Sequence, residues 1–310
     1  MISQWIEAIM DPNLQWILIG SALLGLSSGV LGCFTYLRKQ SLMGDALSHA
    51  ALPGICIAFM ITGTKSIFGF LIGAAIAGIL ATLMIGWITR YSKLKQDAAL
   101  GIVLSVFFGF GIVLLTQIQH SDSGNQSGLD KFLFGQAASM VLTDVVTQAI
   151  ISVLLIVICV LFFKEFKIIS FDPGFARGMG IRVGILEQLL MLLVVIAVVV
   201  GIQAVGVVLM AALLITPAVA ARYWTEKLGV MVILSGVFGA ISGCIGAFVS
   251  SMGANLPTGP LSVLAATLMF VISLLFAPKR GLLMKLIRFT LLRRKTRMEQ
   301  QSITERGRAV

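Results

Sequence analysis

Long apolar runs recur along this chain, and they restrict its fold more than any other feature of the sequence. A run of about 20 apolar residues is enough for one α-helix to cross the hydrocarbon core of a bilayer. The segments fall at residues 14–36, 48–63, 66–89, 98–118, 143–163, 185–203, 205–221, 228–250 and 261–277. Period-2 alternation of apolar and polar residues, which a membrane-spanning β-strand requires, is absent. The pattern predicts an all-α polytopic membrane protein with about nine transmembrane helices.

The composition supports a membrane fold and leaves a small range in the helix count. Only 12% of the 310 residues are charged, and the mean hydropathy is +1.02. A soluble domain carries about 25% charged residues, so this chain has too little polar surface for one. Segment 48–63 is short, and segments 185–203 and 205–221 are almost continuous. Eight to ten helices are therefore consistent with the sequence.

Basic residues are strongly biased to alternate connections between the apolar segments. If every second connection is assigned to one side of the membrane, that side receives 21 of the 23 Lys and Arg residues, leaving Lys65 and Lys131 opposite. Cytoplasmic loops carry the excess of Lys and Arg, so we expect the N-terminus outside and the C-terminus inside. The net charge of +10 follows from this bias and does not indicate nucleic-acid binding. We expect one transmembrane domain at 1–277 and a basic, lipid-contacting cytoplasmic tail at 278–310.

The stretch GDALSHAALPG, residues 44–54, places a carboxylate and an imidazole beside an apolar segment. Asp45 and His49 are four residues apart and would share one face of a helix. Ionisable groups within the bilayer are costly and are usually functional. One interpretation is structural, with Asp45 capping the next helix. The other is a pair of ligands for a divalent metal such as manganese, iron or zinc, completed by a second copy across a two-fold axis.

Two prolines lie within apolar segments and predict breaks in the helices near an ion path. Pro53 and Gly54 follow His49 by one turn, and Pro217 lies in the segment 205–221. Proline removes a backbone donor and breaks or kinks a helix, and transporters build ion sites from such interrupted helices. A plain kink is the alternative at each position.

The stretch SFDPGFARGMGIRVG, residues 170–184, lies between apolar segments on the basic side. Asp172, Pro173 and Gly174 form a turn signal. Phe171, Phe175 and Met179 then recur at intervals of four and would form one apolar stripe of a short helix. A plain loop would explain the stretch, but an exposed stripe could also dock into a groove of a partner.

Sequence signatures of an ATPase and of a zinc metalloprotease are absent from the chain. It contains no GxxxxGK[ST] phosphate loop and no HExxH motif. The first would supply the phosphate cradle of an ATPase, and the second would supply the metal ligands of a metalloprotease. We therefore expect a transport subunit that does not itself hydrolyse ATP, rather than an enzyme.

Three stretches, SLMGDALSHAALPGICIAF, SFDPGFARGMGI and VGVVLMAALLITPAVAAR, occur in this order. Together they resemble the membrane permease of bacterial ABC importers for manganese, zinc or iron. The resemblance covers nearly all of residues 14–277. It implies a multi-pass plasma-membrane protein that works as a dimer of identical or related permeases. It also implies two cytoplasmic ATPases and a delivery protein, either an extracellular metal-binding lipoprotein or a periplasmic binding protein.

The resemblance also assigns roles to residues. It implies that Asp45 and His49 line the translocation path. It implies that 171–181 form the helix that couples to the ATPase, with the contact made through Phe171, Asp172, Pro173, Phe175, Ala176, Arg177, Met179 and Gly180. The cargo is a transported divalent ion, and no permanently bound cofactor is expected. Carboxylate and imidazole ligands without a firmly placed cysteine favour manganese slightly.

Three other functions remain open at this point. A secondary cation transporter or channel, driven by an ion gradient, would work without an ATPase and would leave residues 170–184 without a role. An intramembrane enzyme would use Asp45 and His49 for acid–base chemistry but would need further polar groups. A related permease for a chelate or vitamin would not need the Asp–His pair at all.

Overall fold

The computed structural model is a bundle of α-helices, with no strand among the residues it describes. These are 12–40, 42–63, 67–120, 142–205, 207–252 and 256–285. The helices are α2 (Pro12–Leu37), α3 (Met43–Thr62), α4 (Ile67–Tyr91), α5 (Gln96–Gln119), α7 (Leu142–Leu161), α8 (Phe163–Phe171), α9 (Pro173–Gly178), α10 (Val183–Val205), α11 (Val207–Trp224), α12 (Leu228–Ser251) and α13 (Thr258–Phe276). The predicted all-α polytopic fold is confirmed.

Within the described residues, eight helices are long and apolar enough to cross a membrane. They are α2, α3, α4, α5, α7, α10, α12 and α13. Helix α11 is also apolar but has 18 residues, fewer than any of these eight. Eight spans and a shorter ninth apolar helix agree with the predicted range of eight to ten helices. The short helix begins in the near-continuous stretch 185–221, where the number of helices was uncertain from the sequence.

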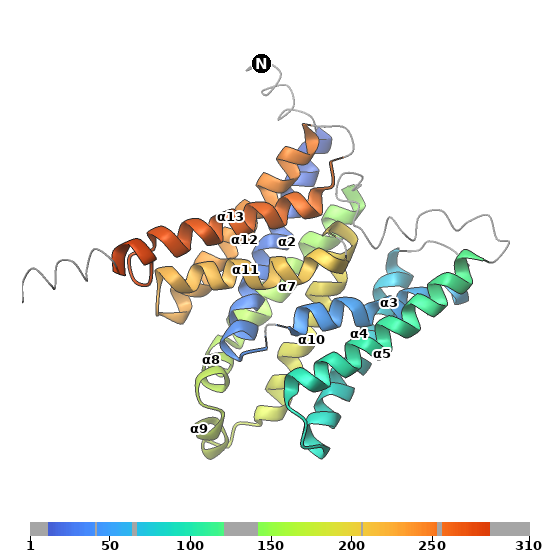
Figure 1. Ribbon diagram of the computed structural model, residues 1–310, viewed down its shortest axis with the longest axis horizontal. Coiled ribbons are helices and arrows are strands. Elements are labelled where there is room, and N and C mark those ends of the chain that lie inside the picture. The colour runs from blue at the N-terminus through green and yellow to red at the C-terminus, as the bar shows by residue number, and fades with distance from the viewer. Residues whose placement is uncertain are drawn as a thin grey trace, which may run out of the picture.

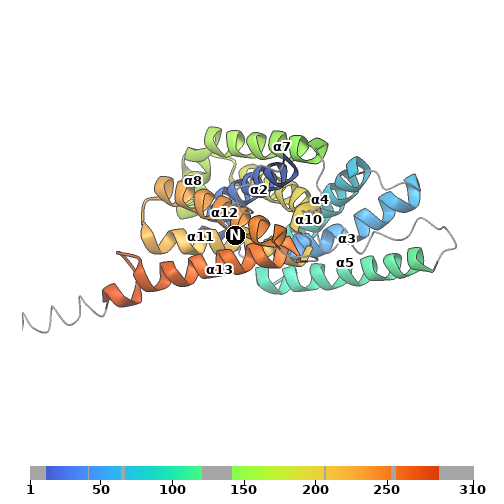
Figure 2. The same cartoon turned by 90° about the horizontal axis from the view of Figure 1, so that it is seen from above.

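The helices form two groups, which are joined by α10 and by the packing of α11 on α3. Figure 1 shows α3, α4 and α5 together on one side of the molecule, with α11, α12 and α13 on the other. Seen from above, α5 and α13 lie along one side and α7 along the opposite side, with α2 between them (Figure 2). Helix α10 contacts α3 and α4 as well as α2, α7, α11 and α13. Together with α11, which also packs on α3, it connects the group that carries Asp45 to the rest of the bundle.

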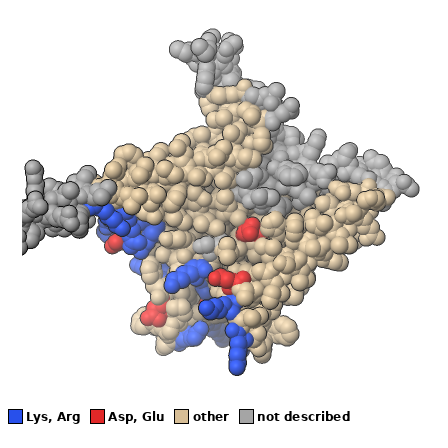
Figure 3. Space-filling model, in the orientation of Figure 1, with Lys and Arg blue, Asp and Glu red and all other residues tan. Residues whose placement is uncertain are grey.

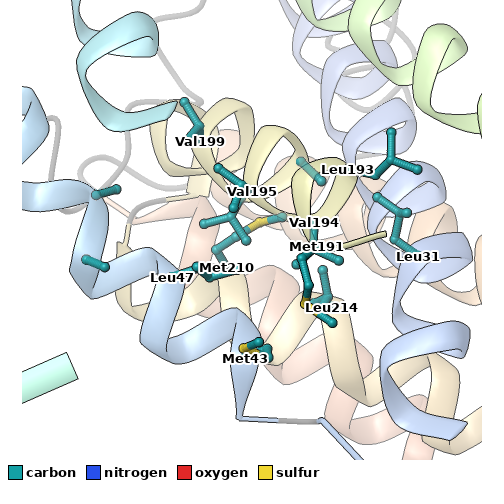
Figure 4. Close-up of a cluster of buried hydrophobic side chains, with 14 of the residues drawn as sticks. Leu31, Met43, Leu47, Met191, Leu193, Val194, Val195, Val199, Met210 and Leu214 are labelled. Atoms are coloured by element: carbon teal, nitrogen blue, oxygen red, sulfur yellow. The ribbon is translucent and has the colours of Figure 1, made fainter. Parts of the chain in front are cut away.

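A buried apolar cluster fixes the beginning of α3. Met43 and Leu47 from α3 lie beside Met191 from α10 and Leu214 from α11 (Figure 4), and none of them is more than 4% exposed. Because Met43 is held in this cluster, the helix begins five residues before the apolar segment that started at residue 48. Asp45 is therefore inside the helix rather than in the loop before it.

Helices α2 and α12 approach so closely that glycine is required at the contact. A Cβ added to Gly239 would lie 2.0 Å from the carbonyl oxygen of Gly25, and one added to Gly243 would lie 2.3 Å from that of Ser21. Small residues at four-residue spacing allow membrane helices to pack in this way.

Replacing Gly239 with Val is expected to destabilise the protein strongly, by about 3 kcal/mol, because the backbone of α2 would have to move away. The measurement is the midpoint of thermal unfolding in detergent. Gly101→Ala on α5 is the matched control, since its added Cβ would meet no atom within 4 Å and alanine favours a helix. An unchanged midpoint for Gly239→Val would contradict the close packing.

The predicted breaks at the two intrahelical prolines are not present. Helix α3 continues through Pro53 and Gly54, and α11 continues through Pro217. The close packing of α3 on α4 requires glycine at position 54, because an added Cβ would lie 2.1 Å from the carbonyl oxygen of Gly73 on α4. The glycine therefore permits close packing of α3 on α4 rather than interrupting the helix. Pro53 still removes one backbone donor one turn after His49.

Basic side chains gather at one end of the bundle. Figure 3 shows Lys and Arg at the lower end of the molecule and at its lower left, while the upper part of this face carries none that is described. The residues come from the connections α2–α3, α4–α5, α7–α10 and α11–α12 and from the end of α13. The predicted grouping of these connections is therefore present in three dimensions. Lys65, Lys131 and residues 286–310 of the tail lie outside the described residues.

Candidate functional site

The N-terminal turn of α3 carries the first candidate residues. Leu42 occupies the N-cap position and makes no side-chain cap, and Asp45 is the third residue of the helix. The alternative in which Asp45 is the N-cap is therefore wrong, although its charge is still favourable in the first helical turn. Ser48 faces a buried environment and donates its hydroxyl to the carbonyl of Gly44.

Asp45 and His49 lie one turn apart with their side chains together. His49 Nε2 is 3.5 Å from Asp45 Oδ1, which is longer than an ordinary hydrogen bond. The side chains are 42% exposed for Asp45 and 19% exposed for His49. His49 Nδ1 is buried and has no hydrogen-bond partner within the described part of the chain. The pair thus opens to the surface of the single chain.

The spacing of the pair suits two ligands of one metal ion. Ligand bonds of about 2.1 Å place two donor atoms roughly 3.0 Å apart at a right angle and roughly 3.5 Å apart at a tetrahedral angle. The observed 3.5 Å lies at the upper end of that range. The described residues contain no group of three or more His, Cys, Asp or Glu that could hold a metal. One chain therefore presents an incomplete set of ligands.

An aromatic residue of α5 holds the histidine and was not found from the sequence. The rings of Phe108 and His49 have centroids 4.7 Å apart and an interplanar angle of 76°. This edge-to-face contact orients the imidazole. Phe108 stands in a long apolar run in which no local pattern distinguishes it, so only the packing of α5 on α3 reveals it.

The second candidate segment is built differently from the single short helix that was predicted. Helix α8 ends at Phe171, Asp172 lies outside both helices, and α9 begins at Pro173. Proline disfavours the helical conformation for the residue before it, which explains the break at Asp172. Asp172 Oδ1 then accepts a hydrogen bond of 2.9 Å from the Phe175 amide and caps α9.

The apolar stripe of this segment is present and exposed. Phe171, Phe175 and Met179 are 50–60% exposed, whereas Ala176 is fully buried. Arg177 lies in the last turn of α9, and Gly180 adopts a left-handed conformation with φ of 80° that ends the segment. Large apolar side chains exposed at the basic end of a membrane bundle are suited to contact with another protein.

These features define a class of protein. A bundle of membrane-spanning helices with an ionisable pair in one span and an exposed amphipathic segment at its basic end is a polytopic membrane protein of the transport type. The profile of the ABC 3 transport family matches residues 10–277, so the chain belongs to this family.

Individual relatives agree with the family. The chain is 56% identical to the manganese transport system membrane protein MntC of Bacillus subtilis, over 96% of this chain and 68% of that protein. It is 46% identical to the zinc transport system membrane protein TroC of Treponema pallidum, over 90% and 93%. Among solved structures, PsaBC from Streptococcus pneumoniae in complex with Fab has a TM-score of 0.79 and 36% identity, covering 90% of this chain and 98% of that one.

Proposed function

We propose that this protein is the membrane permease of an ATP-driven importer that moves divalent transition-metal ions into a bacterial cytoplasm, with manganese as the first choice. The family and the relatives named for manganese and zinc transport support this. The Asp45–His49 pair is the observation that carries the proposal. Oxygen and nitrogen donors at this spacing are ligands for a divalent first-row metal, and an apolar helix has no other evident need for them.

In the proposed mechanism, Asp45 and His49 of two permease chains meet near a two-fold axis and supply four ligands. A transport site must bind its ion weakly enough to release it, and a site shared between two moving chains meets that need. We place the N-terminus outside and the basic end of the bundle inside. An inside-negative potential then favours inward movement of a dication by about 4.6 kcal/mol per 100 mV.

The remaining energy comes from partners. ATPase subunits would bind at the exposed stripe of α8 and α9, and an extracellular or periplasmic metal-binding protein would deliver the ion to the opposite end. Residues 1–277 form the transmembrane permease domain, and the basic tail that follows would contact the cytoplasm and anionic lipid. Pro53, Gly54 and Pro217 would shape the helices near the ion path through packing and kinking rather than through breaks.

The test is uptake of manganese and zinc into liposomes that contain the permease with its ATPase and delivery protein. We expect uptake of Mn²⁺ to require internal ATP and to exceed uptake of Zn²⁺ at equal concentration. Liposomes without the ATPase are the control. Uptake that proceeds without ATP and follows an imposed ion gradient would identify a secondary transporter and overturn the proposal.

A further inference from the structure

A cavity of about 740 Å³ lies at the basic end of the bundle, apart from the Asp45–His49 pair. It is bounded by the α2–α3 connection, the last turns of α4, the first turn of α5, α9, and the beginning of α10. Its polar lining includes Arg38, Arg90, Arg177, Glu187 and Gln188. Three guanidinium groups against one carboxylate give this lining a formal charge of +2, which favours an anion.

Arg38 is the buried charged side chain in the lining of this cavity. Its side chain is only 9% exposed, and its Nη2 donates to Glu187 Oε1. Its Nε and Nη1 are buried without a hydrogen-bond partner in the described part of the protein. Unpaired donors of a buried charge are costly, and guanidinium groups pair well with the oxygens of a phosphate. The buried guanidinium, the cavity and the excess of positive charge together indicate a site for a phosphate group.

An apolar groove of about 330 Å³ continues from the cavity along the bundle. The two share Thr82, Leu83 and Gln188 as lining residues. The groove lies between α4 and α10. Its remaining lining residues are all apolar: Ile79, Ile185, Leu189, Leu192 and Val195. A ligand that filled both spaces would have a phosphate at one end and a hydrocarbon chain at the other.

Aromatic side chains place the mouth of the cavity at the level of the lipid headgroups. Trp87 and Tyr91 line it from α4 and are 66% and 72% exposed. Arg90 lies between them in sequence, and its guanidinium carbon is 5.8 Å from the centre of the Tyr91 ring. Tryptophan and tyrosine are enriched where a membrane helix meets the interface, and basic pockets between helices on the cytoplasmic side bind anionic headgroups.

We propose that this cavity and groove form a binding site for one anionic phospholipid. The headgroup phosphate contacts Arg38, Arg90 and Arg177, and one acyl chain occupies the groove between α4 and α10. The bound lipid then joins α4, α9 and α10. It thereby links the segment that carries Phe175 to the beginning of α10. The site depends on the membrane location of the chain and not on which metal is carried.

The test compares soluble short-chain phosphatidylglycerol with short-chain phosphatidylcholine as ligands of the detergent-purified full chain. The midpoint of thermal unfolding is followed as each lipid is titrated. We expect phosphatidylglycerol to raise the midpoint in a saturable manner and phosphatidylcholine to leave it nearly unchanged. Arg90→Gln should weaken the apparent affinity about fivefold, the effect of about 1 kcal/mol for one basic residue near a lipid surface. Lys93→Gln changes an exposed basic residue that follows α4 and lies outside the cavity, and it should leave the affinity unchanged.

A second pair of variants separates a lipid from a free phosphate. Ile79→Trp would fill the groove and should weaken binding of phosphatidylglycerol, whereas Ile76→Trp, on α4 but outside this groove, should not. Glycerol 3-phosphate alone should have little effect at the same concentrations. Equal stabilisation by glycerol 3-phosphate with no effect of Ile79→Trp would identify a free phosphate site and overturn the lipid. Equal losses of affinity in Arg90→Gln and Lys93→Gln, or equal shifts of the midpoint with the two lipids, would indicate non-specific binding. Either result would also overturn the proposed lipid site.

Discussion

Uptake of Mn²⁺ into reconstituted liposomes is expected to fall at least about tenfold when His49 is replaced by Gln or Asp45 by Asn. Changes to groups that merely support a metal ligand cost ten- to a hundredfold, and these substitutions would remove the ligands themselves. Asp45 also supplies the negative charge that offsets the cost of a dication within the bilayer. Because each permease chain would contribute the same pair, one substitution in a homodimer removes two of the four ligands.

The folded state should survive these substitutions. Both side chains are partly exposed in the single chain, and Asp45 makes no cap that α3 needs. The measurements are the rate of Mn²⁺ uptake, the recovery of the complex with its ATPase, and the rate of ATP hydrolysis. Ser48→Ala is the matched control, because it lies on α3 between the two residues and loses only a bond to the Gly44 carbonyl.

The two outcomes have different meanings. Loss of uptake with an intact complex would place the pair on the ion path. Normal uptake in both variants would show that Asp45 and His49 are not ligands of the transported ion, and the proposed path would have to be abandoned while the family assignment would stand. Loss of uptake in Ser48→Ala as well would point to disruption of α3 rather than to loss of ligands.

The fold class followed from the sequence because bilayer thickness imposes a length on each apolar run. The grouping of basic connections at one end was equally predictable, because it depends on alternation along the chain rather than on packing. The residue at which α3 begins could not be predicted in this way. The apolar run started at residue 48, but burial of Met43 against α10 and α11 starts the helix earlier. A helix boundary set by tertiary contacts leaves little trace in local sequence.

The candidate site was predictable only in part for a similar reason. Asp45 and His49 were found because ionisable residues are rare in such a chain and four residues bring them to one helix face. Phe108 and the Arg38–Glu187 pair were missed, because each joins helices that are distant in sequence. The prolines were overinterpreted, since Pro53 and Pro217 are accommodated inside continuous helices. At Asp172 the opposite happened. The Asp-Pro turn signal was enough to predict that the helix breaks there, but the segment was interpreted as a single helix.

Replacing Phe175 with Ser is expected to lower the affinity of the permease for its ATPase by roughly thirtyfold or more, since a buried aromatic anchor of an interface is worth about 2 kcal/mol or more. Phe175 is 60% exposed in the single chain, so its loss should not disturb the bundle. The measurements are the amount of ATPase that copurifies with the permease and the ATP-dependent uptake of Mn²⁺. Leu282→Ser is the control, because Leu282 is a 47% exposed apolar residue beyond α13.

The cap of α9 provides an independent check on the same interface. Asp172→Ala removes the acceptor for the Phe175 amide and should cost α9 about 1 kcal/mol, whereas Asn can still cap the helix. We therefore expect Asp172→Ala to weaken ATPase binding by less than Phe175→Ser does, and Asp172→Asn to restore it. If Phe175→Ser and Leu282→Ser both bind the ATPase as the wild type does, the stripe of α8 and α9 is not the coupling surface. If Asp172→Asn fails as Asp172→Ala does, the charge of Asp172 rather than the geometry of α9 is what the ATPase recognises.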